Sequence, residues 1–211
     1  MATKAARSVF VNCPFDVDFT PGFRALIFAV IASGFTARCA REMDDASETR
    51  IDKLYRIIEQ CQYGVHDLSR TELCPTGVGD EALPRFNMPL ELGIFLGCKR
   101  FGGVEGQKKR CLILDVEPYR YQRFVSDLAG MDINAHDGDP RRMVARVRDW
   151  LVTVSRRRSI PPTVAILESW DAFCVALPAM IALGGLAPDD LAYPDFERLV
   201  LAWVRERPPA S

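Results

Sequence analysis

The sequence lacks an excess of charge of either sign. Its 211 residues contain 27 Lys and Arg against 28 Asp and Glu, so the formal net charge is −1 at pH 7. A chain this close to neutral has no overall attraction to nucleic acid or to an anionic lipid bilayer. We therefore expect neither nucleic acid nor a membrane to be its partner.

Patterns typical of metal sites and disulfide frameworks are also absent. His66 and His136 are the only histidines, and their spacing fits no zinc motif. The seven cysteines are an odd number and include no C-x-x-C pair. Most of them lie in apolar runs, where a thiol behaves as a small hydrophobic group. We expect no bound metal and no disulfide framework.

Two common nucleotide-binding motifs are missing as well. No G-x-G-x-x-G follows the first predicted strand, and there is no G-x-x-x-x-G-K-[ST]. A Rossmann dehydrogenase and a P-loop ATPase are therefore not supported. The basic N-terminal residues precede only a short apolar stretch, too brief for a signal peptide or a membrane span, so we expect a cytoplasmic protein.

Short apolar segments alternate with segments of helical periodicity. The predicted strands are residues 8–13, 35–40, 62–69, 110–115 and 132–136, and the predicted helices are residues 19–31, 51–58, 88–97, 121–128 and 143–154. The segments at 104–109 and 116–120 are predicted turns, and Asp45 or Ser47 is the predicted cap of the second helix. Strands that are apolar throughout are typical of a parallel sheet covered on both faces. The expected fold class is α/β, with a doubly wound, mostly parallel five-stranded sheet.

The segment SRRRSIPP at 155–162 is the best candidate for a boundary, because it contains three consecutive arginines and two prolines. We predict an α/β domain over residues 1–158 and a small helical appendage over residues 163–211, with helices around 170–181 and 196–204.

Polar side chains gather in the segments that follow the predicted strands, where ligands bind in parallel α/β sheets. Asp67 and Ser69 lie near the end of the third strand, and Asn87 and Glu91 lie four residues apart at the start of a helix. A helix N-terminus favours an ionised Glu91, which could stabilise positive charge, attack an anomeric carbon or hold ribose hydroxyls. A purely structural role is open too, with Asn87 as helix cap and Asp67 bonded to nearby backbone.

The motif D-L-S at 67–69, followed by N-x-x-x-E-L-G-x-x-x-G at 87–97, resembles the superfamily that joins nucleoside 2-deoxyribosyltransferases to bacterial TIR-like domains. The segment VFVNCPFD at 9–16 is similar to the first strand and loop of that superfamily. The resemblance spans about residues 8–154 and implies a flavodoxin-like or TIR-like fold. It also implies that Glu91 is catalytic, that Asn87 belongs to the same pocket, and that the protein assembles as a homo-oligomer, in a setting such as bacterial defence.

The leaving group distinguishes the reactions that this superfamily performs. The nicotinamide of NAD is a cation that departs neutral, whereas the base of a nucleoside needs a proton from an acid. The acidic residue that deoxyribosyltransferases commonly carry shortly before their glutamate is absent here, where Arg85, Phe86 and Asn87 stand. This favours NAD as the substrate, with no cofactor.

Three hypotheses follow. In the first, an NAD glycohydrolase uses Glu91 as electrostatic stabiliser or transient nucleophile, Asn87 to orient it, and Asp67 and Ser69 to shape the ribose pocket. In the second, a nucleoside or nucleotide N-glycosidase or 2-deoxyribosyltransferase uses Asp67 as the acid. In the third, the chain senses a nucleotide without turnover or serves as an assembly module. The remaining predicted substrate-binding residues are Asn12, Phe15, Asp16 and Arg41, with Phe15 or Tyr63 stacking on a ring.

Overall fold

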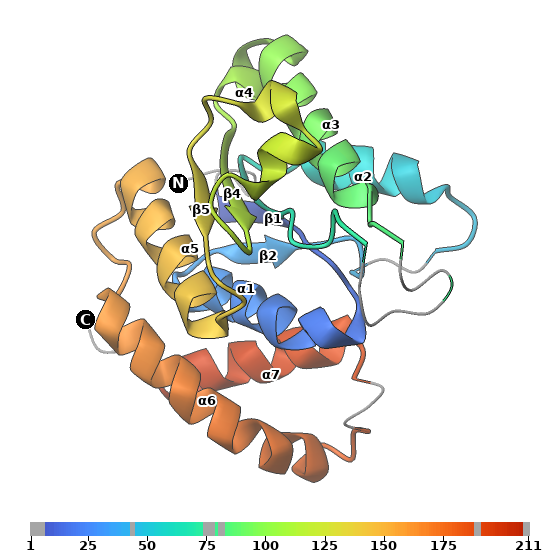
Figure 1. The fold of residues 1–211 in the computed structure, drawn as a ribbon. Coiled ribbons are helices and arrows are strands. Elements are labelled where there is room, and N and C mark those ends of the chain that lie inside the picture. Colours follow the sequence, from blue (N-terminus) through green and yellow to red (C-terminus); the bar gives the residue numbers. More distant parts are fainter. Residues whose placement is uncertain (1–6, 43–44, 74–78, 80–82, 188–190, 209–211) are drawn as a thin grey trace.

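The computed structural model describes residues 7–42, 45–73, 79, 83–187 and 191–208, and these form an α/β fold built on one parallel sheet (Figure 1). The strands are β1 (Ser8–Asn12), β2 (Thr36–Arg38), β3 (Tyr63–Asp67), β4 (Arg110–Asp115) and β5 (Ile133–Ala135). Their order across the sheet is β2-β1-β3-β4-β5, and every pairing is parallel. The predicted doubly wound, five-stranded sheet is confirmed.

Helices cover both faces of this sheet. They are α1 (Thr20–Ala32), α2 (Arg50–Glu59), α3 (Asn87–Phe101), α4 (Gly103–Gln107), α5 (Pro140–Ser155), α6 (Thr163–Leu183) and α7 (Tyr193–Glu206), with 3-10 helices η2 (Val17–Phe19), η4 (Arg120–Arg123) and η5 (Ser126–Leu128). In Figure 1, α1 and α5 lie on one side of the sheet, α2 and α3 lie on the other, and α6 and α7 form a further layer beneath α1.

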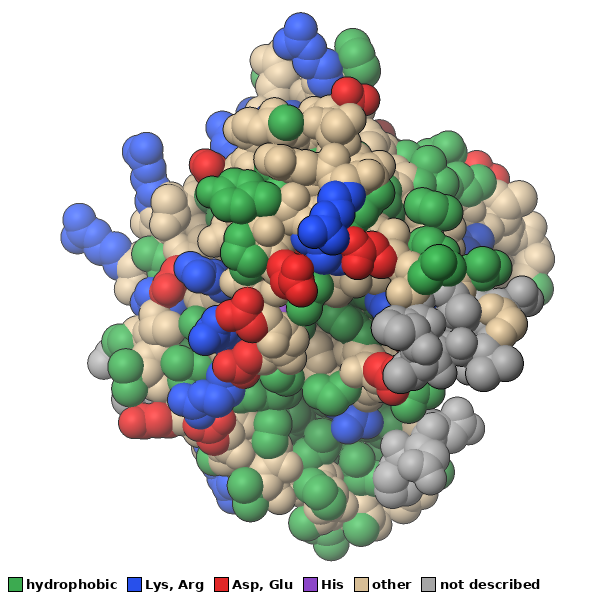
Figure 2. Space-filling view, in the orientation of Figure 1, with side chains coloured by type: hydrophobic (Ala, Val, Ile, Leu, Met, Phe, Trp, Pro, Cys, Tyr) green, Lys and Arg blue, Asp and Glu red, His purple; other side chains and the backbone are tan. Residues whose placement is uncertain are grey.

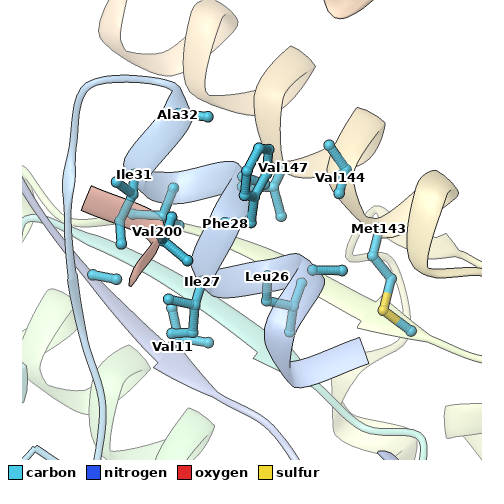
Figure 3. Close-up of a cluster of buried hydrophobic side chains, with 14 of the residues drawn as sticks. Val11, Leu26, Ile27, Phe28, Ile31, Ala32, Met143, Val144, Val147 and Val200 are labelled. Carbon is cyan, nitrogen blue, oxygen red and sulfur yellow. The ribbon is translucent and has the colours of Figure 1, made fainter. Parts of the chain in front are cut away.

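Helix α1 is the centre of the largest hydrophobic cluster. Leu26, Ile27 and Phe28 are completely buried, although they point in different directions from the helix. Figure 3 shows why: side chains reach α1 from the sheet, from α5 through Val147, and from α7 through Val200. A helix enclosed in this way needs apolar residues all round rather than on one stripe.

The C-terminal helices share this core. Trp170 and Phe173 of α6, and Phe196 and Trp203 of α7, belong to the same cluster as Phe28 of α1. Helix α6 is long and apolar enough to cross a membrane by length and composition alone. One face of it nevertheless packs into the interior of a compact α/β domain.

Two local predictions are wrong. The segment at 104–109, a predicted turn, contains most of α4, which begins after a single residue, Gly102, that follows α3. Glycine makes this possible, because a Cβ at Gly102 or Gly106 would collide with the carbonyl oxygen of Cys98. The predicted helix at 121–128 is instead the pair η4 and η5, whose backbone bonds, such as Phe124 N–H to the Tyr121 carbonyl, span three residues.

The predicted cap of α2 is also wrong. The Thr49 hydroxyl accepts the Asp52 backbone N–H and is the N-cap of this helix. Asp45 and Ser47 bond to each other instead, because the Asp45 carboxylate accepts both the backbone N–H and the hydroxyl of Ser47. This local turn ends before the helix begins.

Candidate functional site

Parallel strands bring several polar residues to one edge of the sheet. Asn12 ends β1, Asp67 ends β3, Asp115 ends β4, and His136 directly follows β5. All four side chains are buried. Strands β1 and β3 are neighbours. The chain runs from β1 to β2 on one side of this pair and from β3 to β4 on the other side. In doubly wound folds, ligands bind between two neighbouring strands of this kind, beyond their carboxyl ends.

Glu91 lies in the second turn of α3, close to this point. Its side chain is almost completely buried, with 3% of the residue exposed. It lines a hollow of about 180 Å³ together with Arg50, Ile51 and Leu54 of α2 and Asn87 and Leu90 of α3. Among the residues that the structure describes, none forms a hydrogen bond with the Glu91 carboxyl group.

Burial changes the protonation of Glu91. Loss of water raises the pKa of this carboxyl from 4.5 to about 7, and the Arg50 guanidinium opposes the rise only in part. The sequence suggested an ionised carboxylate, favoured by the helix N-terminus. The helix dipole acts mainly within the first turn, whereas the Glu91 side chain lies further along the helix and in an apolar setting. Near neutral pH both the acid and the carboxylate are therefore present.

Asn87 and Asn12 occupy different positions around Glu91. Asn87 is the exposed first residue of α3 and lines the same hollow, but within the described part of the chain no hydrogen bond joins it to Glu91. The helix cap is Phe86, so the structural role considered for Asn87 is wrong. Asn12 is buried, and its amide nitrogen donates to the Met88 carbonyl at 2.9 Å, which holds the start of α3 against the sheet.

Asp67 and Ser69 belong to a buried network with His136. The Asp67 carboxylate accepts the Ser69 backbone N–H at 2.9 Å, and its other oxygen lies 2.9 Å from His136 Nε2. The Ser69 hydroxyl lies 3.0 Å from the same ring nitrogen. Because Gly138 N–H donates to His136 Nδ1, the proton of the neutral ring resides on Nε2.

This network is not a catalytic triad. In a triad the serine and the aspartate contact opposite nitrogens of the histidine, whereas Ser69 and Asp67 both contact Nε2 of His136. Asp67 has no exposed surface, and both its oxygens are engaged. Sequence reasoning missed His136, although its position after the last strand of the sheet was a usable signal.

The predicted binding residues after β1 and β2 bond to one another and to other side chains of the protein. The Asp16 carboxylate accepts hydrogen bonds from Arg85 at 2.9 Å and Arg70 at 3.2 Å. Burial tends to raise the pKa of Asp16, but these two arginines outweigh it and lower the pKa below its usual value. The Arg41 guanidinium stacks over the Phe15 ring at 4.7 Å.

Tyr63 lies far from this site. It is the first residue of β3, at the amino-terminal ends of the strands, whereas Asp67 lies at the carboxyl ends. Its ring packs edge-on against Phe35 and Trp150. The prediction that Tyr63 could stack on a substrate ring is therefore wrong. In the described residues, no group of three or more His, Cys, Asp or Glu could hold a metal ion.

Comparison with known proteins gives no match to a family model, to a curated protein or to a solved structure. The resemblance to the TIR-like and deoxyribosyltransferase superfamily therefore rests on the sequence alone, on the segment at 9–16 and the motif around Asp67 and Glu91.

Proposed function

We propose that this protein cleaves the N-glycosidic bond of a nucleotide, and that NAD is the substrate, giving nicotinamide and ADP-ribose or a cyclised form. The observation that carries the proposal is Glu91, a buried carboxyl group without a hydrogen-bond partner among the described residues, facing a hollow at the ligand-binding edge of the sheet. Buried carboxyl groups with shifted pKa values in such places are typical of catalytic sites.

A single carboxylate is enough for this reaction. Breaking the bond sends its electron pair to nicotinamide, which departs neutral without needing a proton, and leaves positive charge on the ribose that an ionised Glu91 stabilises. Water then adds to the same ribose carbon and releases a proton to give ADP-ribose, whereas attack by a nucleophile of the same molecule gives the cyclised form. The other acids nearby are engaged: Asp67 by Ser69 and His136, and Asp16 by two arginines. These contacts leave Glu91 as the carboxyl group that can act at the hollow.

The hollow of about 180 Å³ is smaller than typical ligand pockets, which begin near 300 Å³. It accommodates the sugar at which the bond breaks rather than a whole dinucleotide. Arg50, Asn87 and Leu90 at its margin are exposed, so the rest of a dinucleotide would extend from the hollow into solvent.

A second reaction is favoured by the pKa of Glu91, which is about 7. A glutamic acid that is still protonated near neutral pH can donate its proton to a departing base. A nucleoside or nucleotide N-glycosidase or 2-deoxyribosyltransferase would then use Glu91 itself as the acid, in place of Asp67.

The pH dependence of turnover distinguishes these reactions. Purified protein is incubated with NAD and separately with a panel of deoxynucleosides, and free nicotinamide or free base is followed by chromatography. NAD cleavage requires the carboxylate, so its rate should rise with pH through about 7; base release requires the acid, so its rate should fall over the same interval. Glu91→Gln should lower either rate by about 10²-fold or more.

Glu105→Gln is the matched control, because Glu105 is an exposed residue of α4. Turnover that survives in Glu91→Gln, or that falls equally in Glu105→Gln, contradicts the assignment of Glu91. Nucleotide binding without turnover under every condition would instead support the third hypothesis, a sensing or assembly module.

The cellular setting is part of the same proposal. It places the protein in the cytoplasm, and the resemblance to TIR-like domains adds assembly as a homo-oligomer and a role in bacterial defence. The face of the molecule shown in Figure 2 has acidic and basic side chains next to one another, which agrees with a partner that is a small molecule rather than a polyanion.

A further inference from the structure

Arg50 differs from the other arginines at the ligand-binding edge of the sheet. Arg41 stacks on Phe15, Arg70 and Arg85 bind Asp16, and Arg120 is buried against Asp115. Arg50 is exposed, and within the described residues it has no hydrogen bond and no ion pair. It lines the same hollow as Glu91, whose carboxyl group it influences electrostatically.

Two helix N-termini meet at this hollow. Arg50 and Ile51 open α2, and Asn87 opens α3. No side chain caps α3 at its N-cap residue, Phe86. The Thr49 hydroxyl already accepts the Asp52 N–H in the first turn of α2, and Pro89 in the first turn of α3 has no N–H, so it is mainly the two helix dipoles that favour an anion here. The guanidinium of Arg50, which has no partner in the described part of the chain, adds a full positive charge at the same place.

The other residues that line the hollow, and its volume, limit which molecule can bind there. Ile51, Leu54 and Leu90 are apolar, and the carboxyl group of Glu91 has no partner in the described structure. The hollow is too small for two separate ligands, at about 180 Å³. An anion that binds near Arg50 and a group that faces Glu91 would therefore have to belong to one small piece of a single molecule.

We propose that Arg50 binds a phosphate group carried by the same sugar on which Glu91 acts, so that the site selects sugar phosphates over uncharged sugars. This inference rests on the proposed function of Glu91 for the identity of the sugar. A planar guanidinium forms two parallel hydrogen bonds with phosphate oxygens, which a free lysine cannot do. Arg50 is thus a specificity-determining residue that the sequence motif does not include.

Binding of ribose 5-phosphate tests the inference without requiring turnover. Isothermal titration of the wild-type protein with ribose 5-phosphate and with ribose should show tighter binding of the phosphate by about 10- to 100-fold, as expected for charge-assisted hydrogen bonds. Arg50→Ala should remove this preference. Arg100→Ala, which deletes the same charge from the exposed far end of α3, should retain it.

Inorganic phosphate identifies the source of the selectivity. Binding of inorganic phosphate as tight as that of ribose 5-phosphate would overturn the inference, because the site would then recognise a free anion. Equal binding of ribose 5-phosphate by wild type and Arg50→Ala would overturn it as well. A thermal melt of Arg50→Ala confirms that the variant is folded.

A second comparison links Arg50 to turnover. Nicotinamide mononucleotide and nicotinamide riboside have the same leaving group and differ by one phosphate. At a pH well above the pKa of Glu91, where its carboxylate is formed with and without Arg50, the wild-type protein should have a lower KM for the mononucleotide, and Arg50→Ala should raise that KM by about 10- to 100-fold with little change in kcat. If neither compound is cleaved but ribose 5-phosphate binds through Arg50, the proposed reaction fails and the inference about phosphate stands.

Discussion

A buried carboxyl group without a hydrogen-bond partner is unfavourable for folding, and Glu91 is such a residue as far as the structure describes the chain. Its neutral form suffers less from burial than its charged form, which is why the pKa rises to about 7. The described residues offer no hydrogen bond that would compensate. A residue of this kind lowers stability where a function requires it.

The pKa of Glu91 makes stability depend on pH. In the unfolded chain Glu91 loses its proton near pH 4.5, whereas in the folded protein it does so near pH 7. The folded state is therefore penalised as pH rises from 4.5 to 7, by about 3 kcal/mol once the carboxylate is formed in both states. Glu91→Gln, measured by urea unfolding, should gain this amount relative to wild type between pH 4 and pH 8.

The exposed Glu105 gives the reference for this measurement. Glu105→Gln should follow the wild-type stability profile at every pH, because its side chain is largely in solvent. A stability difference between Glu91→Gln and wild type that stays constant with pH would show that the pKa of Glu91 is ordinary.

Single residues show how far the sequence could predict the site. The motif identified Glu91 and Asn87, and the structure brings both to one hollow. Arg50 could not be found in this way, because its relation to Glu91 depends on how α2 and α3 approach each other. The pairing of Asp67 with His136 joins residues 69 positions apart and depends on the order of strands in the sheet.

At the scale of secondary structure, the position of α2 determines where Arg50 lies. The helix begins at Arg50 because the preceding Thr49 caps it. Thr49→Ala should lower the free energy of unfolding by about 0.5–2 kcal/mol through loss of this cap. Ser47→Ala, at a residue that the sequence also suggested as the cap, should change it by less than about 0.5 kcal/mol. Urea unfolding of both variants measures the difference, and an equal effect would contradict the assignment of the cap.

Helices and strands with a clear pattern of apolar residues agree with the prediction. Helix α4, which depends on a close approach of the backbone to Cys98, does not. The strand at 110–115 has the same bounds in the sequence prediction and in the structure, because an unbroken apolar run in a buried parallel sheet is unambiguous. Helix α4 has no such pattern. It forms where glycines let the chain pass close to the end of α3, which composition alone does not reveal.

At the scale of the whole molecule, α6 and α7 extend the main core rather than forming one of their own. Phe173 of α6 is completely buried, and its ring lies 5.2 Å from Phe28 of α1 and 5.7 Å from Trp203 of α7, centre to centre. The sequence indicated helices after the boundary segment. It could not show that their apolar faces meet α1, because α1 is apolar on every side.

This shared core predicts that the C-terminal helices and the sheet unfold together. Phe173→Ala should lower the free energy of unfolding by about 3–5 kcal/mol, as expected for removing a buried ring. If unfolding is cooperative, amide hydrogen exchange in β1 and in α6 should accelerate together by about 10²- to 10⁴-fold. Phe101→Ala, at an exposed residue of α3, should leave both rates unchanged.

Acceleration in α6 and α7 alone would mean that these helices open independently and that residues 163–211 are a separate appendage. A common acceleration would instead mean that α6, α7, α1 and β1 unfold as one cooperative unit. The packing of α6 and α7 on α1 would then stabilise the sheet, including the carboxyl ends of the strands near Glu91.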